Sequence, residues 1–89
     1  MPRTSYSEIH SKAVGSRLRE TRKALGLTQA EIAGRLKVQP PYIARVEAGR
    51  VNLTIGQLGN IASALGVGFD VDFKIPKREY KMLARSSTR

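Results

Sequence analysis

The side chains with the clearest chemistry in this sequence are its sixteen lysines and arginines, which outnumber seven aspartates and glutamates. The formal net charge is therefore +9, and the excess is spread along the chain and heaviest at its two ends. Such an excess favours binding to a polyanion, which would be DNA, RNA or an acidic protein. The alternative is a basic surface that serves only solubility.

Groups suited to catalysis or metal binding are sparse. The chain has no cysteine, which excludes disulfides and thiolate metal sites. Its one histidine, His10, lies near a terminus, where we expect it to be solvated. Asp70 and Asp72 stand two residues apart, as in a cation site, but the solvent face of a strand is the better interpretation. No nucleophile has a base nearby in any motif, so we expect no enzyme, no cofactor and no metal.

Two short helices joined by a tight turn are predicted within residues 28 to 49. Thr28 and Glu31 have the spacing of a capping box, in which each side chain satisfies a free backbone donor at the helix start. Pro40 and Pro41 fit the first turn of the second helix, where the helix needs no backbone N–H. Two such helices at a steep angle form a helix-turn-helix unit, which can set a helix into the major groove of DNA.

Two further helices flank this unit. The first should begin at Ser7 or Ser11 and run to Leu25, and the second follows a capping box at Thr54 and Gln57. Helical spacing predicts which side chains face the core. They are Val14, Leu18, Leu25, Ile32, Ala33, Leu36, Ile43, Val46, Ile55, Leu58, Ile61, Ala62 and Leu65.

The pattern changes to period two over residues 67 to 75, which predicts one β-strand with one wet face. Its apolar row is Val67, Phe69, Val71, Phe73 and Ile75, and the last four are the expected dimer interface. A lone strand leaves its backbone groups unpaired, so we expect antiparallel pairing with the same strand of a second copy across a two-fold axis. The alternative is an edge segment that lies on its own helical core.

The expected organisation is a flexible segment at residues 1–10, a helix-turn-helix domain at 11–66, a dimerisation strand at 67–75 and a flexible basic tail at 76–89. No apolar run is long enough to span a bilayer, and the N-terminus has no apolar signal-peptide region. We therefore expect a cytoplasmic protein with no membrane partner.

The motifs of residues 15 to 67 resemble the Xre or phage-repressor type of helix-turn-helix domain. The resemblance rests on the GLTQAEIA core, the I-x-x-V-E-x-G helix end and the ALGV close. With the C-terminal strand, the chain looks most like HipB-like antitoxins, which dimerise through such a strand. The implied fold is mainly α, a repressor-like domain of four to five helices plus one β-strand that pairs across a homodimer.

The resemblance also implies roles for single residues. Gln29 and Arg50 match positions that contact phosphates, and Lys37 and Arg17 are further candidates. The second helix of the unit would read bases through Gln39, Pro41, Tyr42, Ala44 and Arg45. Of these, the guanidinium of Arg45 suits guanine and the amide of Gln39 suits adenine, whereas Pro41 and Ala44 offer apolar surface to thymine methyl groups.

The sequence departs from the family pattern at three positions. Pro40 and Pro41 stand where related domains usually place polar readers, so DNA shape should supply more of the specificity. Lys37 replaces a common glycine; it is mildly strained if the turn needs positive φ, and otherwise simply adds a phosphate contact.

Arg22 and Glu47 match a family ion pair, although they could be two unrelated surface charges.

These features lead to two functional hypotheses. The first is a sequence-specific repressor that binds palindromic double-stranded DNA as a homodimer, in its narrowest form an antitoxin that represses its own operon and binds a cognate toxin. A stand-alone Xre-type regulator or a restriction-modification controller without a toxin is the alternative within this class. The second hypothesis is a protein-interaction module that docks an acidic partner.

Overall fold

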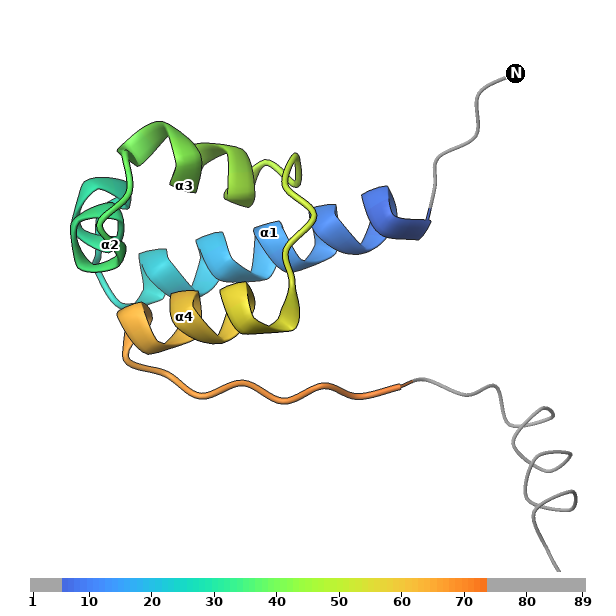
Figure 1. Cartoon of the computed structure of the whole chain (residues 1–89). Helices are drawn as coiled ribbons and strands as arrows, with labels where there is room; N and C mark the ends of the chain where they lie inside the picture. Colours follow the sequence, from blue (N-terminus) through green and yellow to red (C-terminus); the bar gives the residue numbers. More distant parts are fainter. Residues whose placement is uncertain (1–5, 74–89) are drawn as a thin grey trace, which may run out of the picture.

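The computed structural model describes residues 6 to 73, which form four α-helices (Figure 1). The helices are α1 (Tyr6–Ala24), α2 (Gln29–Leu36), α3 (Pro40–Glu47) and α4 (Ile55–Leu65). The prediction of a mainly helical fold with four helices is confirmed. Helix α1 begins at Tyr6, one residue before Ser7, which is one of its two predicted starts, so residues 6 to 10 of the expected flexible segment 1–10 are helical.

Local sequence signals set the starts of α2 and α4. At α2, Thr28 Oγ1 accepts a hydrogen bond from the backbone N–H of Glu31 at 3.0 Å, and Thr28 N–H donates to Glu31 Oε1 at 2.8 Å. Thr54 and Gln57 make the same reciprocal pair at α4. Each pair satisfies two donors that a helix end leaves free, so both helices begin where the capping boxes predict.

The turn between α2 and α3 passes through Lys37, which has φ 60° and ψ 44°. This is the left-handed region, where a β-carbon is crowded by the carbonyl group and glycine is favoured. Lys37 N–H donates to the carbonyl oxygen of Gly34, which closes the end of α2. The turn therefore needs positive φ, and lysine occupies it with some strain.

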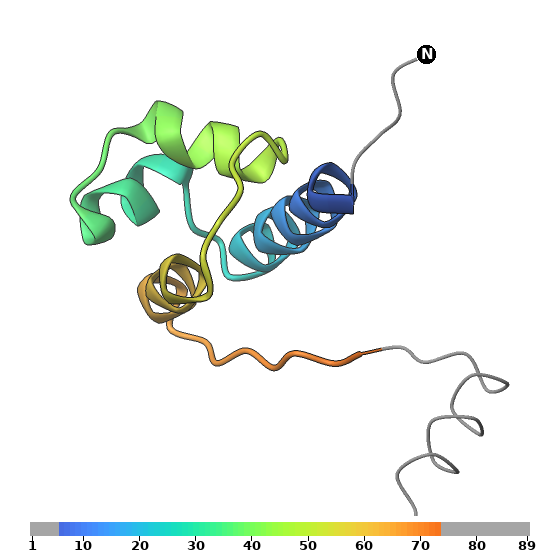
Figure 2. The ribbon, with the colours of Figure 1, turned by 45° about the vertical axis from the view of Figure 1, so that its right-hand side comes forward.

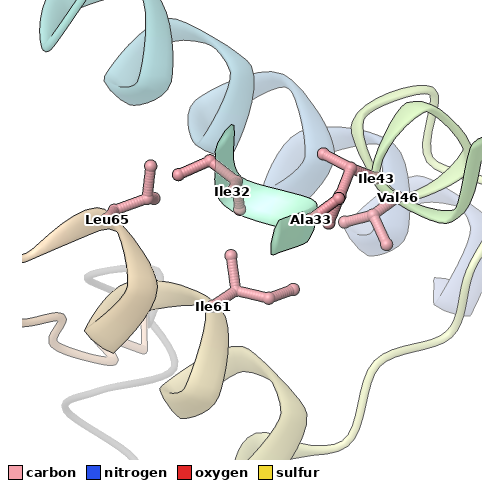
Figure 3. Close-up of a cluster of buried hydrophobic side chains, with 6 residues drawn as sticks. All are labelled: Ile32, Ala33, Ile43, Val46, Ile61 and Leu65. Atoms are coloured by element: carbon pink, nitrogen blue, oxygen red, sulfur yellow. The ribbon is translucent and has the colours of Figure 1, made fainter. Parts of the chain in front are cut away.

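The core lies where the four helices meet, and its buried side chains come from α2, α3 and α4 (Figure 3). They are Ile32, Ala33, Ile43, Val46, Ile61 and Leu65, with Leu18 and Leu36 packed at the edge. Two inward predictions are wrong: Leu25 is 47% exposed and Ile55 is 69% exposed. Leu25 lies just after the end of α1 and Ile55 is the first residue of α4. Helical periodicity predicts an inward position for both, but the packed interface does not reach these helix ends.

After α4 the chain continues as an extended segment without strand pairing among the described residues (Figure 1). Val67 packs against the core, and the ring of Phe69 lies close to Gly59 of α4. Val71 is 57% exposed and Phe73 is 83% exposed. Residues 6 to 73 contain no partner for the predicted strand, and Ile75 and the residues of the predicted basic tail lie outside the described range.

Figures 1 and 2 show α3 and the extended segment on opposite sides of the bundle, with α1 and α4 between them. Contacts made by the extended segment would therefore lie on the side of the bundle away from α3. Across residues 6 to 73, no helix has both the length and the apolar character to cross a membrane.

Candidate nucleic-acid interface

A buried ion pair ties α1 to the end of α3. Arg22 Nε donates to Glu47 Oε2 at 2.6 Å, and Arg22 Nη2 donates to Glu47 Oε1 at 3.0 Å. The two side chains are only 10% and 5% exposed. Arg22 Nη1 also donates to the carbonyl oxygen of Leu27, so the guanidinium fixes the α1–α2 connection as well.

The same carboxylate orients Gln29, the first residue of α2. Gln29 Nε2 donates to Glu47 Oε1 at 3.0 Å, so one carboxylate holds side chains from both α1 and α2. The sequence suggested the Arg22–Glu47 pair but not this third member, because the contact joins residues that share no local motif. Gln29 is the first residue of α2, where free backbone donors and the helix dipole favour an anion.

The network shifts the pKa values of its charged members. Burial raises the pKa of the Glu47 carboxyl, but the hydrogen bonds from Arg22 and Gln29 and the nearby positive charges lower it, and the net pKa is below its ordinary value. The hydrogen bond to Glu47 raises the pKa of Arg22, against the opposing effect of burial. Arg19, absent from the predicted site, is a further cation close enough to act on Glu47.

The exposed face of α3 carries little polarity. Pro40, Ala44 and Ala48 follow one another at intervals of four residues, Pro41 and Arg45 form the next row, and all five are exposed. Ile43 and Val46 face the core instead. The structure describes every residue from Pro40 to Ala48. Among those with exposed side chains, Arg45 is the only charged residue.

Arg45 lies over a neighbouring ring. Its guanidinium carbon is 5.9 Å from the centroid of the Tyr42 ring, one turn earlier on α3, which is within the range of a cation–π contact. The ring is half-buried, whereas Arg45 is exposed. Gln39, which precedes α3, is exposed and makes no side-chain cap bond.

The four predicted phosphate-binding residues do not lie together. Gln29 begins α2, Lys37 forms the α2–α3 turn and Arg50 follows the end of α3, so these three border the helix-turn-helix unit. Arg17 instead lines a groove with side chains of α4 and residues 67 to 70. Arg17 is therefore not grouped with α2 and α3. The sequence pattern of α1 alone could not predict this placement.

This fold and this helix pair define the class of helix-turn-helix proteins. The chain belongs to the helix-turn-helix domain family, whose sequence profile matches residues 13–72. In Rhodospirillum rubrum, an uncharacterised transcriptional regulator in the ATPase CF(0) region is 37% identical over 75 residues, which cover 82% of this chain and 69% of that protein.

Other curated relatives match a shorter stretch. The uncharacterised helix-turn-helix transcriptional regulator y4dJ of Sinorhizobium fredii is 41% identical over 63% of this chain and 73% of its own length. The regulator DdrOP3 of Deinococcus deserti is 39% identical over 57% of this chain, and the match spans only 40% of its length.

Two solved structures share the fold. The restriction-modification controller protein C.AhdI of Aeromonas hydrophila has a TM-score of 0.63 and 32% identity, over 67% of this chain and 91% of its own. The clp gene regulator ClgR of C. glutamicum has a TM-score of 0.64 over 98% of this chain and 97% of its own. At 24% identity, this second likeness shows the fold alone.

Proposed function

We propose that this chain is a sequence-specific DNA-binding transcriptional regulator that acts as a repressor. The observation that carries the proposal is the exposed face of α3, on which Arg45 is the charged side chain and contacts the Tyr42 ring. The chain as a whole has a net charge of +9. Helix α3 enters the major groove, and Arg45 donates to the O6 and N7 atoms of guanine. The relatives described as transcriptional regulators support this function.

In the proposed complex, phosphate contacts come from both ends of the helix-turn-helix unit. Gln29 offers an amide at the start of α2, and Arg50 offers a charge just after α3. These contacts set the position of α3 on the duplex and supply most of the affinity. Binding should therefore weaken steeply as the salt concentration rises.

The proposed regulator is a homodimer. The extended segment that includes the exposed Val71 and Phe73 lies on the side of the bundle opposite α3 (Figure 1), and a second copy could pair with residues 67 to 75 there. Such a dimer would leave both α3 helices free to enter successive major grooves, about 34 Å apart, on a palindromic site.

Within this proposal, two narrower regulatory roles are open. Control of a restriction-modification system is favoured by one observation, the likeness to C.AhdI at 32% identity over 91% of that chain. The role of antitoxin to a cognate toxin stays a prediction from sequence, since none of the relatives named above is described as an antitoxin. The genes beside this one would separate the two roles, because a methyltransferase and a nuclease would accompany a controller and a toxin would accompany an antitoxin.

A binding experiment tests the regulator proposal. Duplexes enriched by the protein from a random-sequence library would be titrated with wild-type protein and with Arg45→Ala, by fluorescence anisotropy. The substitution should cost about 1–3 kcal/mol at the enriched sequence and relax discrimination at one base position. Arg17→Ala is the control for loss of charge: it removes a cation from a groove that contains no α3 side chain, so it should not change discrimination between bases.

Two outcomes would count against the proposal. An equal loss on all sequences would reduce Arg45 to a phosphate contact and remove its base-reading role. A protein that enriches no sequence and retards no duplex at low salt would leave the function without support, and the interaction-module hypothesis would replace it.

A further inference from the structure

Helix α3 presents an unusually small number of hydrogen-bond donors at its start. Pro40 and Pro41 have no backbone N–H, and the N–H of Tyr42 donates to the carbonyl oxygen of Gln39 at 2.9 Å. The first three residues of α3 therefore leave no free backbone donor, although a helix end normally leaves several. The end of α3 that would enter the groove first is thus unsuited to bind a phosphate or a base acceptor through its backbone.

The side chains on the same face are apolar. Pro40, Pro41, Ala44 and Ala48 are all exposed and form one continuous strip along α3, bordered by Arg45. The major groove offers one apolar group for such a strip, the C5-methyl group of a pyrimidine, which thymine always carries and cytosine carries only when it is methylated. Guanine presents its N7 and O6 acceptors there and unmethylated cytosine its N4 amino donor, and these polar groups would lose water against the strip without gaining a partner.

We propose that α3 selects its DNA by pyrimidine C5-methyl groups, packed against Pro40, Pro41 and Ala44, with Arg45 adding the one strong hydrogen-bonded contact. The proposal rests on the proposed function, since it assigns the base chemistry that the same helix reads. It follows that 5-methylcytosine substitutes for the methyl group of thymine at a contacted position. Binding by this protein is therefore sensitive to cytosine methylation of the DNA.

The first experiment uses wild-type protein and the enriched duplexes described above. Each thymine is replaced in turn by uracil, which differs only by the methyl group. At the positions that respond, matched duplexes carrying cytosine and 5-methylcytosine are then compared. Burial of one methyl group predicts that thymine binds about fourfold more tightly than uracil, and 5-methylcytosine about fourfold more tightly than cytosine.

Variants assign the effect to α3. Pro41→Ala removes ring carbons at a position that tolerates alanine, so the thymine-to-uracil ratio should fall towards one at one base position. Ser63→Ala, on the exposed side of α4, is the control and should keep the wild-type ratio. Far-UV circular dichroism checks that each variant is folded.

The outcomes separate this proposal from the proposed function. Equal binding of thymine and uracil duplexes at every position would overturn the methyl readout while leaving sequence-specific binding intact. A ratio that survives Pro41→Ala and also Ala44→Gly would move the methyl contact away from α3 and overturn the assignment. Absence of any enriched sequence would overturn both proposals.

Discussion

Gly15 of α1 lies directly against the last turn of α3, so close that a β-carbon at this position would clash with the carbonyl oxygen of Val46. The carbonyl oxygen of Glu47 would also lie 2.8 Å from that β-carbon. The neighbouring atoms are backbone and cannot rotate away. The angle at which α1 supports α3 therefore depends on the absence of a side chain at Gly15.

Gly15→Ala should lower the free energy of unfolding by about 1–3 kcal/mol, the usual cost of forcing extra atoms into a packed contact. Urea unfolding followed by circular dichroism measures it. Gly34→Ala is the matched control, because Gly34 lies within α2 and its β-carbon would meet open space. That control should be neutral or stabilising by up to about 1 kcal/mol, since alanine has the higher helix propensity.

Arg22→Met should destabilise the protein by about 3–5 kcal/mol, because it leaves the buried Glu47 carboxylate without its cation. The double variant Arg22→Met with Glu47→Leu should recover much of this loss, since no unpaired charge remains buried. Urea unfolding of the two single variants and the double variant gives the coupling energy. Additive losses would show that the pair is not a coupled unit.

Stability should fall in acid through Glu47. Its folded pKa is below the ordinary value of 4.5, so the carboxylate stabilises the fold fully above that value and loses this contribution as pH falls through the folded pKa. Glu31, whose pKa is lowered by its hydrogen bonds to Thr28, acts in the same direction. Urea midpoints between pH 7 and pH 3 would measure the slope, and Glu47→Gln should flatten it. An unchanged slope in that variant would contradict the assignment.

Lys37→Gly should stabilise the protein by about 0.5–1 kcal/mol, because relief of left-handed strain exceeds the extra freedom of glycine in the unfolded chain. The same change tests the phosphate contact, whose loss should reduce the slope of log affinity against log salt by about one. Lys37→Asn removes the charge but tolerates the left-handed conformation, so it should reproduce the salt effect. An unchanged slope in both variants would remove Lys37 from the phosphate contacts.

Phe73→Asp should convert the proposed dimer into a monomer. The side chain is exposed in the single chain, so the change costs little there, but it would place an unpaired charge in the seam of a dimer. Analytical ultracentrifugation would report the mass. Ile55→Asp replaces another exposed apolar side chain, outside the extended segment, and should leave the mass unchanged. If Phe73→Asp also keeps the wild-type mass, the seam lies elsewhere.

Local chemistry explains which parts of this fold the sequence could predict. A capping box such as Thr28 with Glu31 involves residues three apart, and two prolines limit where α3 can start, so both signals act without knowledge of the tertiary structure. The inward faces of Ile32 and Ile61 follow from helical periodicity. Periodicity does not mark where packing ends, so it predicts a buried position for Leu25, which is exposed.

The remaining features depend on contacts between distant residues. Gln29 and Glu47 meet because α2 packs against α3, and no spacing in the sequence encodes that contact. The position of Arg17 depends likewise on where residues 67 to 70 pass α1. An alternating pattern predicts an extended segment but does not identify its partner, so pairing between two copies stays a prediction.

The bond between Gln29 and Glu47 has a consequence for recognition. A glutamine that rotates freely loses about 0.5–1.5 kcal/mol when a ligand immobilises it, and this one is already held in a single orientation when the protein folds. The amide at the start of α2 is thus preorganised and costs the complex little rotamer entropy, whichever duplex is bound. In the proposed complex, sequence preference is then left to α3, and contacts made through α2 strengthen good and poor operators alike.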